Sequence, residues 1–125
     1  MTTPPKLIPL YTTSGDVGAY LAYPYIHNPN GEWIGWVSAD RKVYSVHGHF
    51  VGMLTPELRI VRKRESGTTE PRRQPPAAPQ PLRPPAQAPL APQMPELALT
   101  LMDVLEDGPE LLPPMDAGEL RDDLD

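Results

Sequence analysis

The sequence predicts a small all-β domain of repeated hairpins over residues 7–64, followed by a disordered proline-rich tail with a possible short helix. Composition divides the chain in two. All eight aromatic residues lie between Tyr11 and Phe50, whereas ten of the nineteen prolines lie between Pro71 and Pro95. Aromatic burial offsets the backbone entropy lost on folding, about 1–2 kcal/mol per residue, so a segment without it does not fold alone. An internal repeat in the aromatic half supplies the third observation.

The repeat is anchored on three glycines, Gly15, Gly31 and Gly48, which stand 16 and 17 residues apart. Each closes a turn dipeptide (SG, NG or HG), where glycine adopts a positive φ without a Cβ clash. A short strand carrying an aromatic precedes each turn, and an apolar strand follows it. This pattern predicts three hairpins, at Leu10–Leu21, Tyr25–Val37 and Val43–Leu54.

A small residue lies in the middle of each second strand, four positions after the anchor. These residues are Ala19, Gly35 and Gly52. A missing or minimal side chain at this place lets another backbone or an aromatic ring approach closely, or lets the strand bend.

The fourth unit is incomplete. Residues 57–62 are consistent with one strand, with Leu58 and Ile60 on one face, but no turn glycine and second strand follow. We expect either the N-terminal residues, around Lys6 to Ile8, or a second chain to complete it. Closure would remove exposed sheet edges. Residues 1–6 are predicted to be a flexible N-terminus.

The order of tyrosine, turn glycine, then a hydrophobic-glycine-aromatic/apolar-Leu/Val stretch resembles the four-fold β-flower domain of prokaryotic proteins, over about residues 7–63. The resemblance implies four hairpins around a central axis. That family has no assigned activity or catalytic residues, so the resemblance carries over no function. A domain of under 60 residues is marginal alone, so a homodimer through the aromatic face is a second expectation.

Charge is distributed unevenly along the chain. Residues 1–64 carry +3, residues 65–95 carry +1 and residues 96–125 carry −9. The absence of cysteine rules out disulfides and thiolate metal sites, and favours a cytoplasmic location. No signal-peptide pattern and no apolar run of about 18 residues is present, so we expect no membrane span.

The tail begins with a low-complexity linker, residues 65–95, for which polyproline II is the default conformation. It contains PxxP spacings, Pro76 to Pro79 and Pro81 to Pro84. The spacings fit a ligand of an SH3-like groove, but they arise inevitably at this proline density, so a spacer is the simpler interpretation.

Residues 96–107 predict a short amphipathic helix, because Leu97, Leu101, Val104 and Leu105 fall on one helical face and Gly108-Pro109 ends the pattern. A helix this short is unstable alone and is typical of peptides that fold in a partner's groove. Docking on its own domain, or no role, are the alternatives. Residues 108–125 predict a disordered acidic tail.

Sites for chemistry are poorly supported. His27, His47 and His49, with Asp16 or Glu32, are the metal-competent candidates, but ordinary turn positions explain them, and no nucleophile motif surrounds the serines. We therefore predict no enzyme activity, metal or cofactor. The expected function is a non-enzymatic protein-interaction module for an unidentified protein partner. The alternative is single-stranded nucleic-acid binding by Trp33, Trp36, Arg59, Arg62, Lys63 and Arg64.

Overall fold

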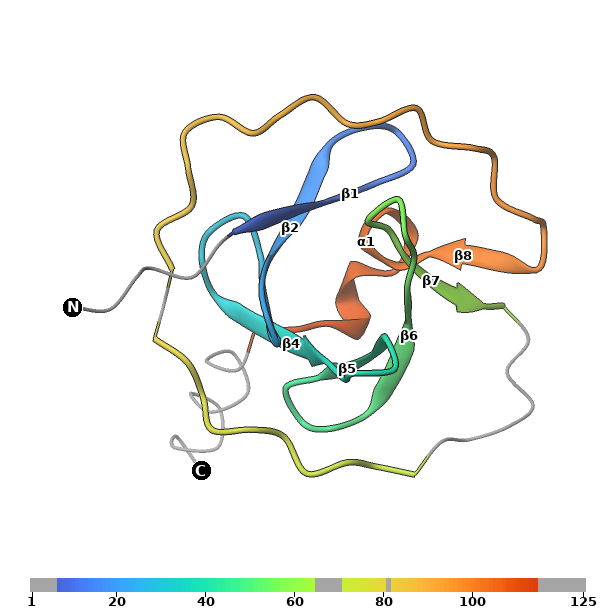
Figure 1. Cartoon of the computed structure of the whole chain (residues 1–125). Helices are drawn as coiled ribbons and strands as arrows, with labels where there is room; N and C mark the ends of the chain where they lie inside the picture. The colour runs from blue at the N-terminus through green and yellow to red at the C-terminus, as the bar shows by residue number, and fades with distance from the viewer. Residues whose placement is uncertain (1–6, 65–70, 81, 115–125) are drawn as a thin grey trace.

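The computed structural model of the chain describes residues 7–64, 71–80 and 82–114. Eight strands form one antiparallel sheet in which each strand pairs with the next along the chain, and the sheet curls around a central core (Figure 1). The predicted all-β fold is therefore confirmed. The strands are β1 (Ile8–Tyr11), β2 (Val17–Ala22), β3 (Tyr25–His27), β4 (Trp33–Val37), β5 (Lys42–Ser45), β6 (Phe50–Leu54), β7 (Ile60–Lys63) and β8 (Leu101–Asp103).

The three predicted hairpins are β1–β2, β3–β4 and β5–β6. Their turn glycines, Gly15, Gly31 and Gly48, all have φ between +88° and +96°. The strand pairing shifts by one residue beside each turn, at Leu10/Tyr11, Ile26/His27 and Val43/Tyr44. A turn closed by a left-handed glycine with a one-residue bulge is a common way to join antiparallel strands, and the positive φ favours glycine at that place.

A polar residue opens every one of these turns. The side-chain oxygen of Thr12, for example, accepts the N–H of Asp16, and the backbone N–H of Thr12 donates to the Asp16 carbonyl. The same local bond is made at the two turns that join β4 to β5 and β6 to β7, where Arg41 and Leu58 take the positive φ instead of glycine. The five residues that open turns in this way are Thr12, Asn28, Ser38, Ser45 and Thr55.

The fourth unit is completed from within the described chain, by β8. β8 lies antiparallel to β7, with Val61 opposite Asp103 and Lys63 opposite Leu101. The expectation that the N-terminus or a second chain would complete this unit is wrong, because β1 pairs with β2 and β8 occupies the place beside β7. The β domain therefore includes the C-terminal segment and does not end at residue 64.

The predicted helix over residues 96–107 is also wrong in extent. Residues 101–103 form β8, and only one turn of helix, α1 (Val104–Asp107), follows it, capped by the Asp103 carboxylate on the N–H of Glu106. A 3₁₀ turn, η1 (Pro109–Leu111), comes next. The apolar residues of this segment had a partner in the β domain, and strand pairing with β7 overrode the helical spacing.

The core lies inside the curled sheet and draws on every unit. Val104 of α1 and Leu112 after η1 are buried within it. The small mid-strand residues serve close backbone approach, as predicted: a Cβ at Gly35 would overlap the Tyr44 carbonyl, and one at Gly52 the Val61 carbonyl. The buried core residues are Leu10, Ala19, Leu21, Ile26, Ile34, Val37, Val43, Val51, Ile60, Val104 and Leu112.

Candidate functional site

Residues 71–80 and 82–97, called the strap below, contain no helix or strand and run around the outside of the β domain before entering β8 (Figure 1). The sequence predicted a disordered linker here, but this segment lies against the domain. Nine of its residues are half-buried, and seven of these recur every three positions with one gap, as expected when one face of a polyproline II helix rests on a surface. The seven are Pro76, Pro79, Leu82, Ala88, Ala91, Met94 and Leu97, and the other two are Pro75 and Pro84.

The strap meets the domain at the hairpin turns. The N–H of Arg73 donates to the Gly48 carbonyl at 2.9 Å, and the N–H of Leu82 donates to the Gly31 carbonyl at 3.0 Å. A Cβ on either glycine would overlap the carbonyl oxygen of the same strap residue. At the third turn, the nearest atom to a Cβ on Gly15 is Ala91 Cβ, at 4.0 Å. The strap therefore advances nine residues for each hairpin unit.

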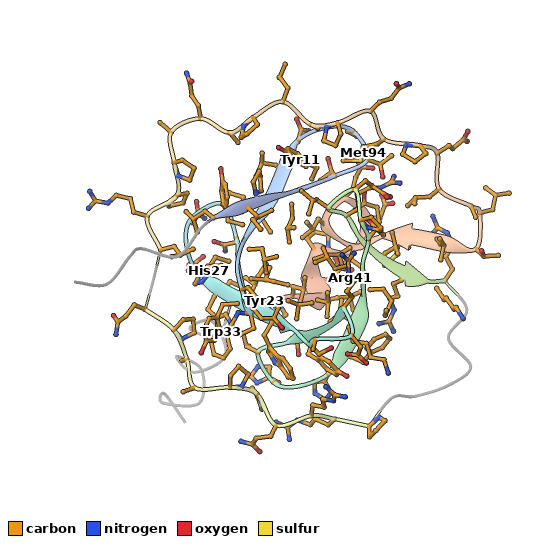
Figure 2. The ribbon with its side chains drawn as sticks, viewed as in Figure 1. Tyr11, Tyr23, His27, Trp33, Arg41 and Met94 are labelled. Atoms are coloured by element: carbon orange, nitrogen blue, oxygen red, sulfur yellow. The ribbon has the colours of Figure 1, made fainter. Side chains whose placement is uncertain are left out.

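Two tyrosine hydroxyls of the domain donate to strap carbonyls. Tyr25 Oη donates to the Ala77 carbonyl at 2.8 Å. Tyr11, which is labelled in Figure 2, donates from Oη to the Pro89 carbonyl at 2.9 Å. A proline-rich chain has few N–H groups but keeps all its carbonyls, so hydroxyl donors from a ring suit it.

An aromatic cluster lies on the outer side of β3–β6, apart from the central core. Trp36 stacks on Tyr44 with ring centroids 4.6 Å apart, and Phe50 meets Tyr44 edge-on at 5.9 Å. Tyr25 and Trp33 form a second edge contact at 6.0 Å. The cluster consists of Tyr25, Trp33, Trp36, Tyr44, Val46 and Phe50.

The strap reaches this cluster through Arg73, whose guanidinium carbon lies 5.2 Å from the centre of the Tyr44 ring. Arg72 adds a bond from Nε to the His47 carbonyl. Within the cluster, Trp33 Nε1 donates to the Gly35 carbonyl at 2.7 Å, but the buried Nε1 of Trp36 has no acceptor among the described residues. A buried N–H without an acceptor is destabilising, and the strap supplies no acceptor for the Trp36 indole.

The far end of the strap is fixed by Arg59, which is 1% exposed. Its guanidinium donates to the Pro95 carbonyl at 2.9 Å, to Thr13 Oγ1 at 3.1 Å and to Glu57 at 2.6 Å. The hydrogen bond from Arg59 lowers the pKa of the Glu57 carboxyl below its ordinary value. Arg59 therefore joins the turn before β7, the β1–β2 turn and the strap.

The four leucine and valine residues predicted to bind a partner do not form an exposed face. Val104 is completely buried and Leu105 packs against the core. Leu97 in the strap and Leu101 in β8 are half-buried. A partner would contact all four side chains only if β8 separated from β7 and α1 left the core.

The residues predicted to bind nucleic acid are also dispersed. Trp33 and Trp36 are buried in the aromatic cluster. Arg59 is inside the domain, and Arg62 donates to the Phe50 and Val51 carbonyls. Arg64 Nε donates to the Leu99 carbonyl at 3.1 Å, and Lys63 is exposed on β7. The structure does not bring them together as an open surface with exposed rings.

The histidines are separated. His47 and His49 are exposed beside the Gly48 turn, whereas His27 is buried with Nδ1 3.2 Å from the Gly31 carbonyl. Burial lowers the pKa of His27. Within residues 7–64, 71–80 and 82–114, no three side chains of His, Asp or Glu gather as metal ligands would. Over the same residues, no helix has the length and apolar character to span a membrane.

Comparison with known proteins gave no match to a family model, to a curated protein or to a solved structure. The site therefore rests on its own geometry. Sequence reasoning missed the strap as part of it, although one signal was present: the non-proline residues Arg73, Leu82 and Ala91 recur every nine positions, where the turns need an N–H or a small side chain.

Proposed function

We propose that this chain is a non-enzymatic protein-interaction module whose hairpin rim binds extended proline-rich segments. The observation that carries the proposal is the strap itself: the rim holds one such segment by Tyr11, Tyr25 and the turns at Gly31 and Gly48. Polyproline II is already extended before binding, so little conformational entropy is lost when it docks.

The contacts define what the rim accepts. Hydroxyl donors take carbonyls, which every residue offers, including proline. Each turn carbonyl, by contrast, needs an N–H, so the positions at Arg73 and Leu82 must not be proline. A ligand is therefore rich in proline but interrupted at regular intervals. A surface that bound any apolar segment would show no such requirement for non-proline residues at fixed positions.

The proposal places recognition on the rim rather than on a tethered acidic-hydrophobic peptide. Val104 and Leu105 pack in the core of the β domain. Residues 97–105 could act as a free peptide only if β8 separated from β7, which would break up the fourth unit. We do not advance single-stranded nucleic-acid binding, because Trp33 and Trp36, the rings expected to stack on bases, are buried.

The test uses the full chain, labelled with ¹⁵N, and a synthetic peptide of residues 71–97 added in trans. The tethered strap competes at an effective concentration of about 1 mM, so the titration must extend into that range. We expect shifts of the Arg73 and Leu82 amides and of both indole N–H signals. A peptide of the same composition in scrambled order, with prolines placed at the positions of Arg73 and Leu82, is the control. If both peptides give the same shifts, or neither gives any, the proposal is wrong.

A further inference from the structure

Resting on the proposed function, we infer that the aromatic cluster is a specific docking site for a peptide containing an arginine two residues before a Pro-Pro pair. In the free chain, strap residues 71–80 mask it. The masking segment has this order itself, Arg73-Gln74-Pro75-Pro76. The ligand of this site in trans is a proline-rich segment of a partner protein with the same order.

The arginine preference follows from Tyr44. Its ring is buried, with Trp36 stacked on it and Phe50 in an edge contact, and the guanidinium of Arg73 lies over it. A planar guanidinium on an aromatic ring gains cation–π attraction. The backbone N–H of the same arginine donates to the Gly48 carbonyl, so side chain and backbone are fixed together.

The Pro-Pro preference follows from burial and from Tyr25. Pro75 and Pro76 are half-buried, whereas the flanking Gln74 and Ala77 are exposed. The hydroxyl of Tyr25 donates to the Ala77 carbonyl directly after the pair. The site therefore covers five consecutive residues, from an arginine to the residue after two prolines.

Trp36 indicates that the strap is not the best occupant. Its indole N–H is buried in the cluster without an acceptor among the described residues. A ligand that offers a carbonyl to this N–H would make one hydrogen bond more than the strap makes. Tethering compensates for the missing bond, since the strap is held nearby at millimolar effective concentration. If substitutions weaken the contacts of the strap, a peptide added in trans should therefore displace it from the site.

The experiment weakens the strap without changing the site. In the full chain carrying R72A/R73A, the strap loses the cation–π contact with Tyr44 and the bond to the His47 carbonyl. We expect a peptide of residues 71–80 to bind this variant about tenfold more tightly than it binds the wild type. The Trp36 indole N–H signal should shift on binding. Arg83→Ala, at an exposed arginine of the next strap unit, is the matched control and should leave the affinity at the wild-type value.

Peptide variants test the order of residues. Replacing the peptide's counterpart of Arg73 by alanine should weaken binding about two- to fivefold. Equal affinity for wild type and R72A/R73A would overturn the masking, and equal affinity for the alanine peptide would overturn the arginine preference. If a peptide of residues 82–97 binds but that of 71–80 does not, this inference fails and the proposed function stands. If neither peptide binds either protein, both fail.

Discussion

Thr13 and Asp103 lie 90 positions apart in the chain and are joined by two hydrogen bonds. The backbone N–H of Thr13 and its hydroxyl both donate to Asp103 Oδ2, at 2.7 and 2.6 Å. The other carboxylate oxygen of Asp103 caps α1 through the N–H of Glu106. Asp103 is 1% exposed, so its charge is compensated by these donors rather than by water. This relationship fastens the last strand and helix to the first hairpin.

Removing the Asp103 carboxylate should loosen that fastening. In Asp103→Ala the two Thr13 donors and the Glu106 N–H lose their acceptor, and these bonds are partly buried. A fully buried unsatisfied donor costs about 1–3 kcal/mol, so each of these three costs nearer the lower end. We expect the free energy of unfolding to fall by about 3 kcal/mol in urea denaturation. Asp107→Ala, at an exposed acid of the same helical turn, is the control and should change it by less than about 0.5 kcal/mol. Equal effects of the two substitutions would contradict the assignment.

The C-terminal segment should prove to be part of the core. Val104→Ala removes two methyl groups from a completely buried position, and we expect a loss of about 2–3 kcal/mol. Leu99→Ala, only five residues earlier but 91% exposed, should be nearly neutral. Thermal unfolding monitored by circular dichroism compares them.

Because β8 and α1 complete the domain, a chain cut after residue 65 should lose the cooperative unfolding transition. A sharp transition in that fragment would refute the role of β8 and α1.

Substitution of a mid-strand glycine should lower the free energy of unfolding more than substitution of the equivalent alanine. Gly52→Ala places a Cβ against the Val61 carbonyl, which is backbone and cannot yield without moving β7. We expect the largest loss among these predictions, above about 3 kcal/mol. Ala19, the corresponding residue of the first unit, already has a Cβ, so Ala19→Gly should cost only about 1 kcal/mol. Urea unfolding of the two variants side by side checks the asymmetry; a tolerant Gly52→Ala would show that the strands are not as close as described.

The strap should be released by a substitution at one turn and not at another. Gly48→Ala puts a Cβ onto the Arg73 carbonyl, whereas Gly15→Ala, with a similar φ of +96° against +89°, meets only Ala91 Cβ at 4.0 Å. Both variants carry the same backbone strain, so their difference isolates the strap. Amide hydrogen exchange of Arg73, whose N–H is bonded to the Gly48 carbonyl, should accelerate in Gly48→Ala only. Acceleration in both would mean that strain alone loosens the segment.

Stability should decline as pH falls through the range of His27. Burial holds the pKa of this histidine below its ordinary value of 6.5, so the unfolded chain takes up the proton first. The contribution of neutral His27 to the free energy of unfolding is fully present above about pH 6.5, and it is lost as the pH drops from there towards the pKa of His27 in the folded chain. Glu57, whose ordinary value is 4.5, contributes only at lower pH. Urea unfolding at pH 7.5, 6.5 and 5.5 measures the slope. His27→Asn retains a donor for the Gly31 carbonyl but cannot titrate, so its slope should be flatter; an unchanged slope would assign the effect elsewhere.

Local rules in the sequence were sufficient for the hairpins. Gly15, Gly31 and Gly48 were placed in turns from their dipeptides, and Gly35 and Gly52 were expected to allow close approach. Both predictions are confirmed, because positive φ and the absence of a Cβ are properties of a single residue. The polar residues that open the turns carried an additional local signal, since each bonds to a backbone N–H four positions on.

Partners that are distant in sequence were not predictable in the same way. The spacing of Leu97, Leu101, Val104 and Leu105 fits one helical face equally well whether a helix forms or not. β7 lacked a neighbour, and pairing with it stabilises a strand at 101–103 by hydrogen bonds that no local pattern records. The candidate site was missed for the same reason. Trp33 and Trp36 were expected to stack on nucleic-acid bases, and the strap, which meets their cluster at Tyr44 and Tyr25, was interpreted as a spacer.

The sequence by itself determined the all-β class, the three hairpins, the turn glycines and the segregation of aromatic and proline-rich halves. Each of these depends on residue-level conformational preference or on composition. Only the tertiary structure decided that Asp103 and Val104 belong to the domain, and that Arg73 lies on Tyr44. Those contacts join residues 29 to 90 positions apart, and their free energy exists only when the sheet has curled and brought both surfaces together.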